Sequence, residues 1–201
     1  MQKFKLIIPF LIAVTILVNA VTGCTRPPLP EPPAAVPIPA VGEQLPEIIL
    51  PAPANPATRI RLGLKNEKAE IFTVQEIDCD ILLVEIFSMY CPFCQREAPN
   101  INRLYNLIQA DRELAEKIKL IGIGVGNSTF EVGVFKKRYN VEFPLFTDSD
   151  FTVHNQLGQV RTPYFFAIRN RGELKNRILI SKLGSLSDPQ KFLQTLSHLL
   201  E

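Results

Sequence analysis

The sequence predicts an α/β domain in which helices cover a mixed β-sheet. Two nearly continuous apolar runs, residues 81–87 and 119–126, have the length of strands that are buried on both faces. Helical patterns follow both runs, because apolar residues recur at helical spacing after the first and a capping-box spacing opens a helix after the second. Because strands that alternate with helices are typical of layered α/β domains, we expect such a domain here.

The folded part is predicted to begin near Val41 with a leading β-hairpin. Apolar residues alternate with other residues in residues 59–64, as in a strand with one buried face. Residues 65–68 are polar and favour a turn, and residues 69–74 have the pattern of a second strand. A hairpin therefore precedes the central strand.

A strand, a turn with two cysteines and a helix form the predicted centre of the domain. Residues 81–87 are the buried strand, and Glu85 is the exception within this apolar run. Residues 92–109 have a helical pattern, and Pro99 is expected to kink this helix.

A second strand–helix unit and a C-terminal group of elements follow. Ser128 and Glu131 have the spacing of a capping box, which predicts a helix after the strand of residues 119–126. Asp188 and Pro189 predict the start of the last helix. The other predicted elements are a short strand at 143–146, a short helix at 150–157, and two strands at 164–168 and 173–180 joined by a turn.

The first 23 residues have the pattern of a signal peptide. Lys3 and Lys5 give a basic start, and residues 6–20 are an apolar run that is short for a spanning helix, which needs about 20 residues. The run ends in "VTGC", which resembles a bacterial lipobox and implies that Cys24 is lipidated and becomes the mature N-terminus. An uncleaved anchor helix and an ordinary signal peptide are the alternatives, and both would also export the rest of the chain.

A proline-rich segment follows Cys24. Between Pro27 and Pro56 lie 11 of the 17 prolines, a composition typical of an extended spacer. We therefore divide the chain into a signal peptide (residues 1–23), a lipidated N-terminus with a tether (24–40) and a folded domain (41–201). Without residues 1–23 the chain has 20 basic and 20 acidic residues, so its charge does not favour nucleic acid as a partner.

Cys91 and Cys94 form a C-x-x-C pair whose position indicates redox chemistry. Cys91 precedes the predicted helix, where the helix dipole and unpaired backbone N–H groups stabilise a thiolate. Cys94 lies one turn further on and is placed to attack a mixed disulfide at Cys91. Pro92 suits the first helical turn because proline has no N–H to leave unpaired. We predict Cys91 as the nucleophile and Cys94 as the resolving thiol.

The segment "LLVEIFSMYCPFCQREAP" resembles the active-site segment of thioredoxin-fold proteins. With the lipobox, the spacer and the leading hairpin, it makes the chain similar to the membrane-tethered TlpA/ResA-like thiol-disulfide oxidoreductases. This resemblance implies a thioredoxin-like three-layer sandwich with a mixed β-sheet, an N-terminal β-hairpin and a strand–helix insertion. It also implies that Thr162 and Pro163 form the cis-proline loop beside the cysteines and, with Tyr90, shape the substrate groove.

Two acidic residues are candidates for proton transfer. Glu85 lies where thioredoxins keep a buried acid, and Glu97 lies where ResA-like proteins keep an acid near the site. Burial in an apolar strand disfavours the charged carboxylate, so Glu85 is expected to exchange protons near neutral pH. The alternatives are a strand-edge acid that reaches water for Glu85 and an exposed helical charge for Glu97.

The resulting functional prediction is thiol–disulfide exchange in the bacterial cell envelope, with reduction of disulfides in exported proteins. The resemblance implies apocytochrome c or another envelope thiol protein as the substrate, and a membrane thiol transporter as the electron donor. It further implies a lipid anchor to the membrane, a domain that faces the periplasm or extracytoplasmic space, and no cofactor.

Two other functions stay open on the sequence alone. A peroxiredoxin-like thiol peroxidase would suit the strand–helix unit of residues 119–139, and Ser88 lies three positions before Cys91 as in a peroxidatic motif, but Val84 stands where that motif has proline. A lipid-tethered binding or assembly module would instead hold the two cysteines as a structural disulfide.

A metal site is disfavoured because ligands are few. The chain has one C-x-x-C pair and two histidines, His154 and His198, which we interpret as ordinary helical residues. Cys79 is interpreted as an unpaired thiol before the central strand.

Overall fold

The structure is a computed structural model, and it describes residues 35–201. The predicted signal peptide, the lipidation site Cys24 and the chain up to residue 34 lie outside the described residues, so these features stay predictions. Among residues 35–201, no helix has both the length and the apolar character needed to cross a bilayer.

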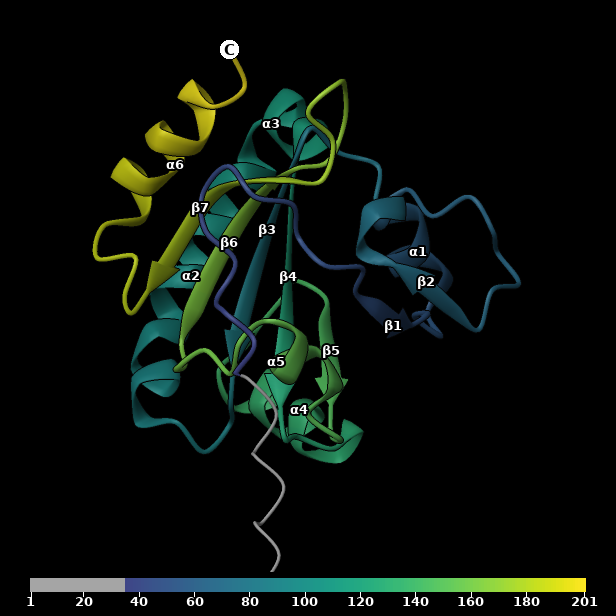
Figure 1. The fold of residues 1–201 in the computed structure, drawn as a ribbon, viewed down its shortest axis with the longest axis vertical. Coiled ribbons are helices and arrows are strands. Elements are labelled where there is room, and N and C mark those ends of the chain that lie inside the picture. Colours follow the sequence, from purple (N-terminus) through teal and green to yellow (C-terminus); the bar gives the residue numbers. More distant parts are fainter. Residues whose placement is uncertain (1–34) are drawn as a thin grey trace, which may run out of the picture. The chain divides into compact units, whose positions relative to one another are not determined.

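Five strands form a central mixed sheet. They are β3 (Ile81–Phe87), β4 (Ile118–Val125), β5 (Leu145–Asp148), β6 (Tyr164–Arg169) and β7 (Arg177–Leu183). The strand order is β5-β4-β3-β6-β7, with β3 in the middle (Figure 1). β3 pairs parallel to β4 and antiparallel to β6, so the predicted mixed sheet is confirmed.

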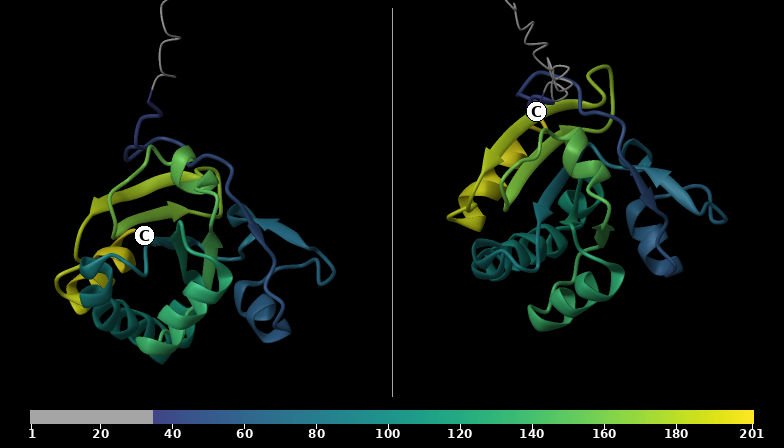
Figure 2. Two further views of the ribbon diagram at one scale, coloured as in Figure 1. Left: turned by 90° about the horizontal axis from the view of Figure 1, so that it is seen from below. Right: turned by 60° about the horizontal axis from the view of Figure 1, so that its bottom comes forward.

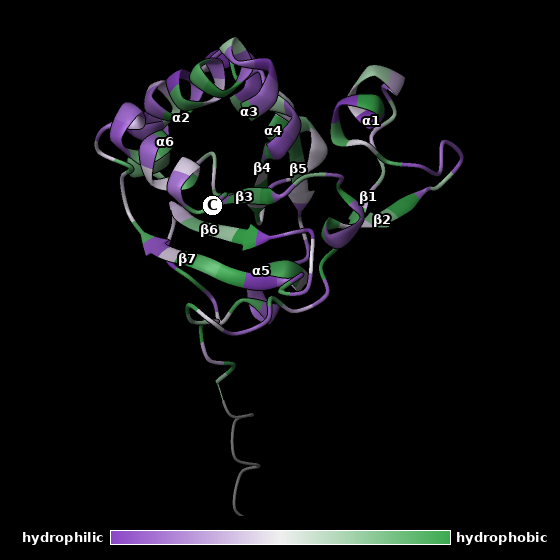
Figure 3. Cartoon of the chain, turned by 90° about the horizontal axis from the view of Figure 1, so that it is seen from above, coloured by the Kyte–Doolittle hydropathy of each residue, from purple (hydrophilic) through white to green (hydrophobic). Residues whose placement is uncertain are grey.

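Helices cover both faces of this sheet. They are α2 (Pro92–Ala110), α3 (Arg112–Lys117), α4 (Thr129–Arg138), α5 (Thr152–Gln156) and α6 (Pro189–His198). Helices α2, α4 and α6 lie on one side of the sheet and α5 lies on the other (Figures 2 and 3). The predicted three-layer arrangement is therefore confirmed.

Strand β3 lies in the centre of both halves of the core. All of its residues are buried, and its side chains alternate between the two faces. One set packs into the core under α5, and the other packs into the core under α2, α4 and α6: Leu82, Val84 and Ile86 belong to the first, and Ile81, Leu83 and Phe87 to the second. Glu85 shares the orientation of the second set, toward the layer that contains Cys94.

The N-terminal hairpin is present, but its first strand is not where the sequence pattern placed it. β1 (Ile49–Pro51) pairs antiparallel with β2 (Ile71–Thr73), which lies inside the predicted second strand. Residues 59–64 are not a strand, because they include most of α1 (Pro56–Leu62).

Local signals explain why α1 is helical. The Asn55 side chain accepts a hydrogen bond of 2.9 Å from Ala57 N, and Pro56 occupies the first turn. Gly63 ends the helix in a left-handed conformation at φ 68°. Ile60 is 78% exposed, so the apolar alternation was not that of a buried strand face.

The other predicted elements agree with the structure to within a few residues. The predicted strand–helix unit of residues 119–139 is β4 and α4, and the capping box of Ser128 and Glu131 is present. Asp188 caps α6 through its side chain. The last strand begins at Arg177 rather than at residue 173, and α3 has no counterpart among the predicted elements.

Residues 36–45, which we call the N-terminal strap, run along β7. Gly42 N donates to Ile178 O at 2.9 Å, and Leu45 N donates to Asn176 O at the same distance. Ser181 Oγ donates to Pro39 O at 3.0 Å, and Pro39 is buried. Part of the segment that we predicted as tether is thus packed on the domain, and the domain boundary near residue 41 stays a prediction.

Candidate active site at the start of helix α2

Cys91 caps the N-terminus of α2, as the sequence predicted. Its backbone is extended, and Pro92 is the first helical residue. The side chain is partly exposed, and the thiol donates a hydrogen bond of 3.3 Å to the backbone carbonyl of Thr162. The helix start and the loop before β6 therefore meet at this sulfur.

The surroundings of Cys91 favour its thiolate. Partial burial works against the charged form, but hydrogen bonds from the Thr162 side chain and from the backbone N–H groups of Cys94 and Phe93 outweigh it. The pKa of the Cys91 thiol therefore lies below its ordinary value. A lower pKa at a partly exposed sulfur is what a nucleophilic cysteine needs.

Cys94 has the opposite environment. It lies one turn further along α2 and has no exposed surface. Burial raises the pKa of the Cys94 thiol, and the nearby Glu85 carboxyl raises it further. The pair is therefore asymmetric, with one accessible sulfur that ionises readily and one enclosed sulfur that stays protonated.

Glu85 is a buried acid on β3, as its position in the sequence suggested. It is 1% exposed, and its Oε1 has no hydrogen-bond partner among the described residues. Burial and then the charge of Glu97 raise the pKa of Glu85 to about 8. The strand-edge alternative, in which Glu85 reaches water or a lysine, does not agree with this burial.

Glu97 is not an exposed helical charge, because its side chain is 4% exposed. Its carboxylate accepts hydrogen bonds from Ser185 Oγ at 2.6 Å, Leu186 N at 2.7 Å and Asn100 Nδ2 at 3.3 Å. The acid on α2 is thereby joined to the loop between β7 and α6. Sequence patterns did not indicate Ser185 or Leu186, which lie almost 90 positions from Glu97 and belong to no motif.

The predicted cis-proline loop lies beside Cys91. The peptide bond between Thr162 and Pro163 is cis, and β6 begins directly after it. A groove of about 480 Å³ opens next to this loop, and it is lined by Ser88, Tyr90, Val125, Gly126, Phe151, His154, Val160, Arg161 and Thr162. Tyr90 and Thr162 thus share one groove.

Tyr90 is an exposed aromatic side chain at the edge of this groove. It is 64% exposed, and its hydroxyl donates to the carboxylate of Glu131 at the start of α4. This bond raises the pKa of the Tyr90 hydroxyl. Glu131 therefore both closes its own helix cap and holds Tyr90.

Three other residues were considered from the sequence: Cys79, His154 and His198. Of these, His154 lines the groove beside the cis-proline loop. Cys79 is buried before β3, at the opposite end of that strand from Cys91, and burial raises its pKa to about 12. His154 Nε2 lies 2.9 Å from the Val160 carbonyl, and His198 is the last residue of α6. In the part of the chain that the structure describes, no three His, Cys, Asp or Glu residues are grouped as a metal site would need.

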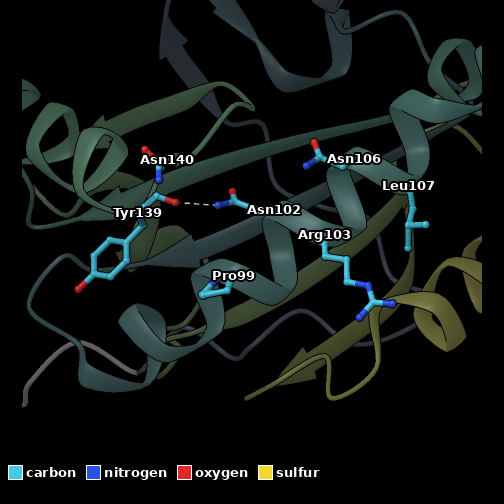
Figure 4. Close-up of a pocket in the computed structure, with 7 residues that line it drawn as sticks. All are labelled: Pro99, Asn102, Arg103, Asn106, Leu107, Tyr139 and Asn140. Atoms are coloured by element: carbon cyan, nitrogen blue, oxygen red, sulfur yellow. Dashed lines mark hydrogen bonds between the residues drawn. The ribbon is translucent and has the colours of Figure 1, made fainter.

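A second hollow lies on the side of α2, away from the two cysteines. It measures about 570 Å³ and is lined by Pro99, Asn102, Arg103, Asn106, Leu107, Tyr139 and Asn140. Figure 4 shows Asn102 directed toward Tyr139, whose carbonyl accepts its side-chain N–H at 2.7 Å. Neither cysteine lines this hollow, so it is separate from the candidate site at the cysteine pair.

Comparison with known proteins finds relatives that are named thiol-disulfide oxidoreductases. The chain is 27% identical over 97 residues to the thiol-disulfide oxidoreductase ResA of Geobacillus thermodenitrificans, covering 48% of this chain and 53% of that protein. It is 25% identical over 116 residues to the ResA of Halalkalibacterium halodurans, covering 57% of this chain and 62% of that protein. The chain therefore matches little more than half the length of these curated relatives.

Solved structures share the fold at low sequence identity. A putative thiol:disulfide interchange protein DsbE from Chlorobium tepidum superposes with a TM-score of 0.60 at 15% identity, over 81% of this chain and 99% of that one. A putative protein disulfide isomerase from Bacteroides thetaiotaomicron gives a TM-score of 0.60 at 17% identity, over 80% and 89% of the two chains. These similarities confirm the thioredoxin-like fold.

The family model with the description AhpC/TSA family matches residues 41–186, most of the domain that contains the cysteine pair, the buried acids and the cis-proline loop. By this match the chain belongs to the AhpC/TSA family, with a thioredoxin-like fold and a C-x-x-C pair at the start of its central helix.

Proposed function

We propose that this protein is a thiol-disulfide oxidoreductase that reduces disulfides in other proteins. One observation carries the proposal: the partly exposed Cys91 has a lowered pKa, and one helical turn away the enclosed Cys94 has a raised pKa. A structural disulfide needs no such asymmetry. The similarity to relatives named thiol-disulfide oxidoreductase ResA supports the same activity.

The proposed reaction moves two electrons from the cysteine pair to the substrate. The Cys91 thiolate attacks one sulfur of a substrate disulfide, the substrate S–S bond breaks, and the other substrate sulfur leaves as a thiolate that takes up a proton. Cys94 then loses its proton and attacks Cys91 Sγ, which breaks the mixed disulfide and releases the second substrate thiol. The substrate is reduced and the Cys91–Cys94 pair is oxidised.

Glu85 is the proposed proton acceptor for Cys94 in the second step. Its carboxyl lies in the same core layer as Cys94, and its pKa of about 8 is close to working pH, so it can both take up and return a proton. Glu97 is the second proposed proton residue, because its charge acts on Glu85 and its hydrogen bond to Ser185 leads toward the surface.

Substrate binding is assigned to the groove beside Cys91. In this proposal, Thr162 and Pro163 receive the substrate backbone and Tyr90 contacts its side chains. The contact between the Thr162 carbonyl and Cys91 Sγ supports this placement, since a chain bound at the loop would bring its disulfide to the nucleophile.

The cellular setting is proposed from the N-terminal pattern. Residues 1–23 would direct export, lipidated Cys24 would anchor the chain, and the domain would face the periplasm or extracytoplasmic space. Exported proteins with thiols or disulfides, including apocytochrome c, would be the substrates. A membrane thiol transporter would return electrons to the Cys91–Cys94 pair.

Trapping tests the reaction. In cells that express the full chain, Cys94→Ala should accumulate mixed disulfides through Cys91, because the resolving thiol is missing. Cys79→Ala is the matched control, since it also removes one buried thiol and should trap nothing. If Cys94→Ala traps no partner while the wild-type chain reduces insulin disulfides, the proposed roles of the two cysteines are wrong.

The two alternatives give different results in the same experiments. Consumption of hydrogen peroxide without insulin reduction would favour the thiol peroxidase. A Cys91–Cys94 disulfide that resists dithiothreitol in the folded protein would favour the binding module.

A further inference from the structure

The loop between β4 and α4 contacts the turn that carries Cys91. Asn127 in this loop is fully buried, and its Oδ1 accepts a hydrogen bond of 2.8 Å from the backbone N–H of Met89. Met89 lies two residues before Cys91 and 38 positions from Asn127. The second strand–helix unit thereby reaches into the backbone of the redox site.

The turn of residues 88–91, which we call the Cys91 turn, is held at several points. Cys91 N donates to Ser88 O at 3.1 Å, which closes the turn. The Met89 carbonyl accepts a hydrogen bond of 2.8 Å from Gln95 Nε2 on α2. The N–H and the C=O of Met89 are therefore both held by side chains from other elements, Asn127 from one side and Gln95 from the other.

Asn127 is itself fixed in place. Its N–H donates to Gly124 O at 3.2 Å, and its carbonyl accepts a bond from the Thr147 hydroxyl on β5. Gly124 has no room for a side chain, because a Cβ there would lie 2.9 Å from Val132 Cγ2 and 3.2 Å from Asn127 Oδ1. The packing around β4 thus leaves the Asn127 amide little freedom to turn away from Met89.

Among residues 35–201, the side chain of Asn127 makes one hydrogen bond, which its Oδ1 accepts from Met89 N. Its Nδ2 is buried and has no partner among the described residues. A buried amide with an unpaired N–H destabilises a fold. The one hydrogen bond that this side chain does make is to Met89, so any stabilisation that it provides acts on the Cys91 turn.

We propose that Asn127 is a positioning residue for Cys91. By holding Met89 N, it fixes the Cys91 turn so that Cys91 Sγ stays within reach of the N–H groups at the start of α2 and of Thr162. Without this bond the turn can shift, and the sulfur loses part of its hydrogen bonding. The effect on thiol reactivity stands independently, and the effect on disulfide exchange rests on the function proposed above.

The test compares two buried asparagines. Asn127→Leu removes the acceptor but keeps the branched shape of the side chain, and Asn127→Ala removes it with a cavity. Asn170→Ala is the matched control, because Asn170 is also buried, also has one unpaired amide atom, and follows β6 at the end of the sheet away from Cys91. Alkylation of Cys91 by iodoacetamide is measured by peptide mass spectrometry between pH 5 and pH 9 in the reduced full chain.

Both Asn127 variants should move the midpoint of Cys91 alkylation upward by about half a pH unit, which lowers the thiolate fraction below that midpoint roughly threefold. Asn170→Ala should leave the midpoint unchanged although it also destabilises the fold. An unchanged midpoint in folded Asn127→Leu, or an equal shift in Asn170→Ala, would overturn the proposal.

A second measurement needs no variant. The Met89 amide of the wild-type chain should exchange its hydrogen slowly, because Asn127 holds it, and exchange at the rate of a free amide would overturn the proposal even if the variants fail to fold. Alkylation uses no protein substrate, so a failure here is distinguishable from a failure of the proposed oxidoreductase function, which appears as absence of trapped partners.

Discussion

Replacing Glu85 by glutamine should change how the free energy of unfolding depends on pH. In the folded chain the pKa of Glu85 is about 8, against an ordinary value of 4.5 that the unfolded chain restores. Between these two pH values the folded chain keeps a proton that the unfolded chain has released. The stability of the wild-type chain therefore falls as pH rises from about 4.5 through about 8, and above that it is flat with respect to this group.

The size of the effect follows from the two pKa values. Each pH unit in this window is worth about 1.4 kcal/mol, so the full span corresponds to about 5 kcal/mol. Between pH 5 and pH 7.5 the wild-type chain should lose about 3 kcal/mol that Glu85→Gln retains. Cys94 and Glu97 lie near the Glu85 carboxyl and are present in both proteins. Their own contributions to the pH dependence therefore cancel to first order when the two unfolding free energies are subtracted.

The assay is urea unfolding followed by far-UV circular dichroism at several pH values, with the cysteines kept reduced. Glu142→Gln is the control, because it removes an exposed carboxyl and should change the unfolding free energy little at any of these pH values. If the wild-type chain and Glu85→Gln show parallel curves from pH 5 to pH 8, Glu85 does not hold a proton in the folded state and its proposed role in proton transfer is wrong.

Three further results are expected. Glu97→Leu should lower the free energy of unfolding by about 2–3 kcal/mol in urea unfolding, because it leaves Leu186 N unpaired, and a loss below 0.5 kcal/mol would contradict the contact. Gly158→Ala should lower the free energy of unfolding by about 1–3 kcal/mol more than Gly172→Ala, because both glycines have positive φ but only a Cβ at position 158 would meet the N-terminal strap, at 2.7 Å. Equal losses of unfolding free energy would mean that the strap is not docked. In the folded chain iodoacetamide should modify Cys91 well before the two buried thiols, and urea should remove this difference.

The strands and most helices could be predicted because their signals are local. The apolar run of β3 marks a strand buried on both faces, and the capping box of Ser128 and Glu131 marks a helix start in any context. The same local approach was wrong at residues 59–64, where the prediction followed the apolar alternation and not the helix cap at Asn55 or the helix end at Gly63. Short segments of this kind fit both the strand period of 2 and the helix period of 3.6, and contacts made on folding decide between the two.

The sequence by itself determined where the cysteine pair lies, because the position of Cys91 before a helix and of Cys94 one turn later follows from their spacing and from the helical pattern after them. Only the tertiary structure decided how this pair is surrounded. The burial of Glu97 against Leu186, the hold of Asn127 on Met89 and the docking of the N-terminal strap on β7 each join residues far apart in the chain. Such contacts depend on which faces meet across the sheet, and a pattern of neighbouring residues contains no record of that.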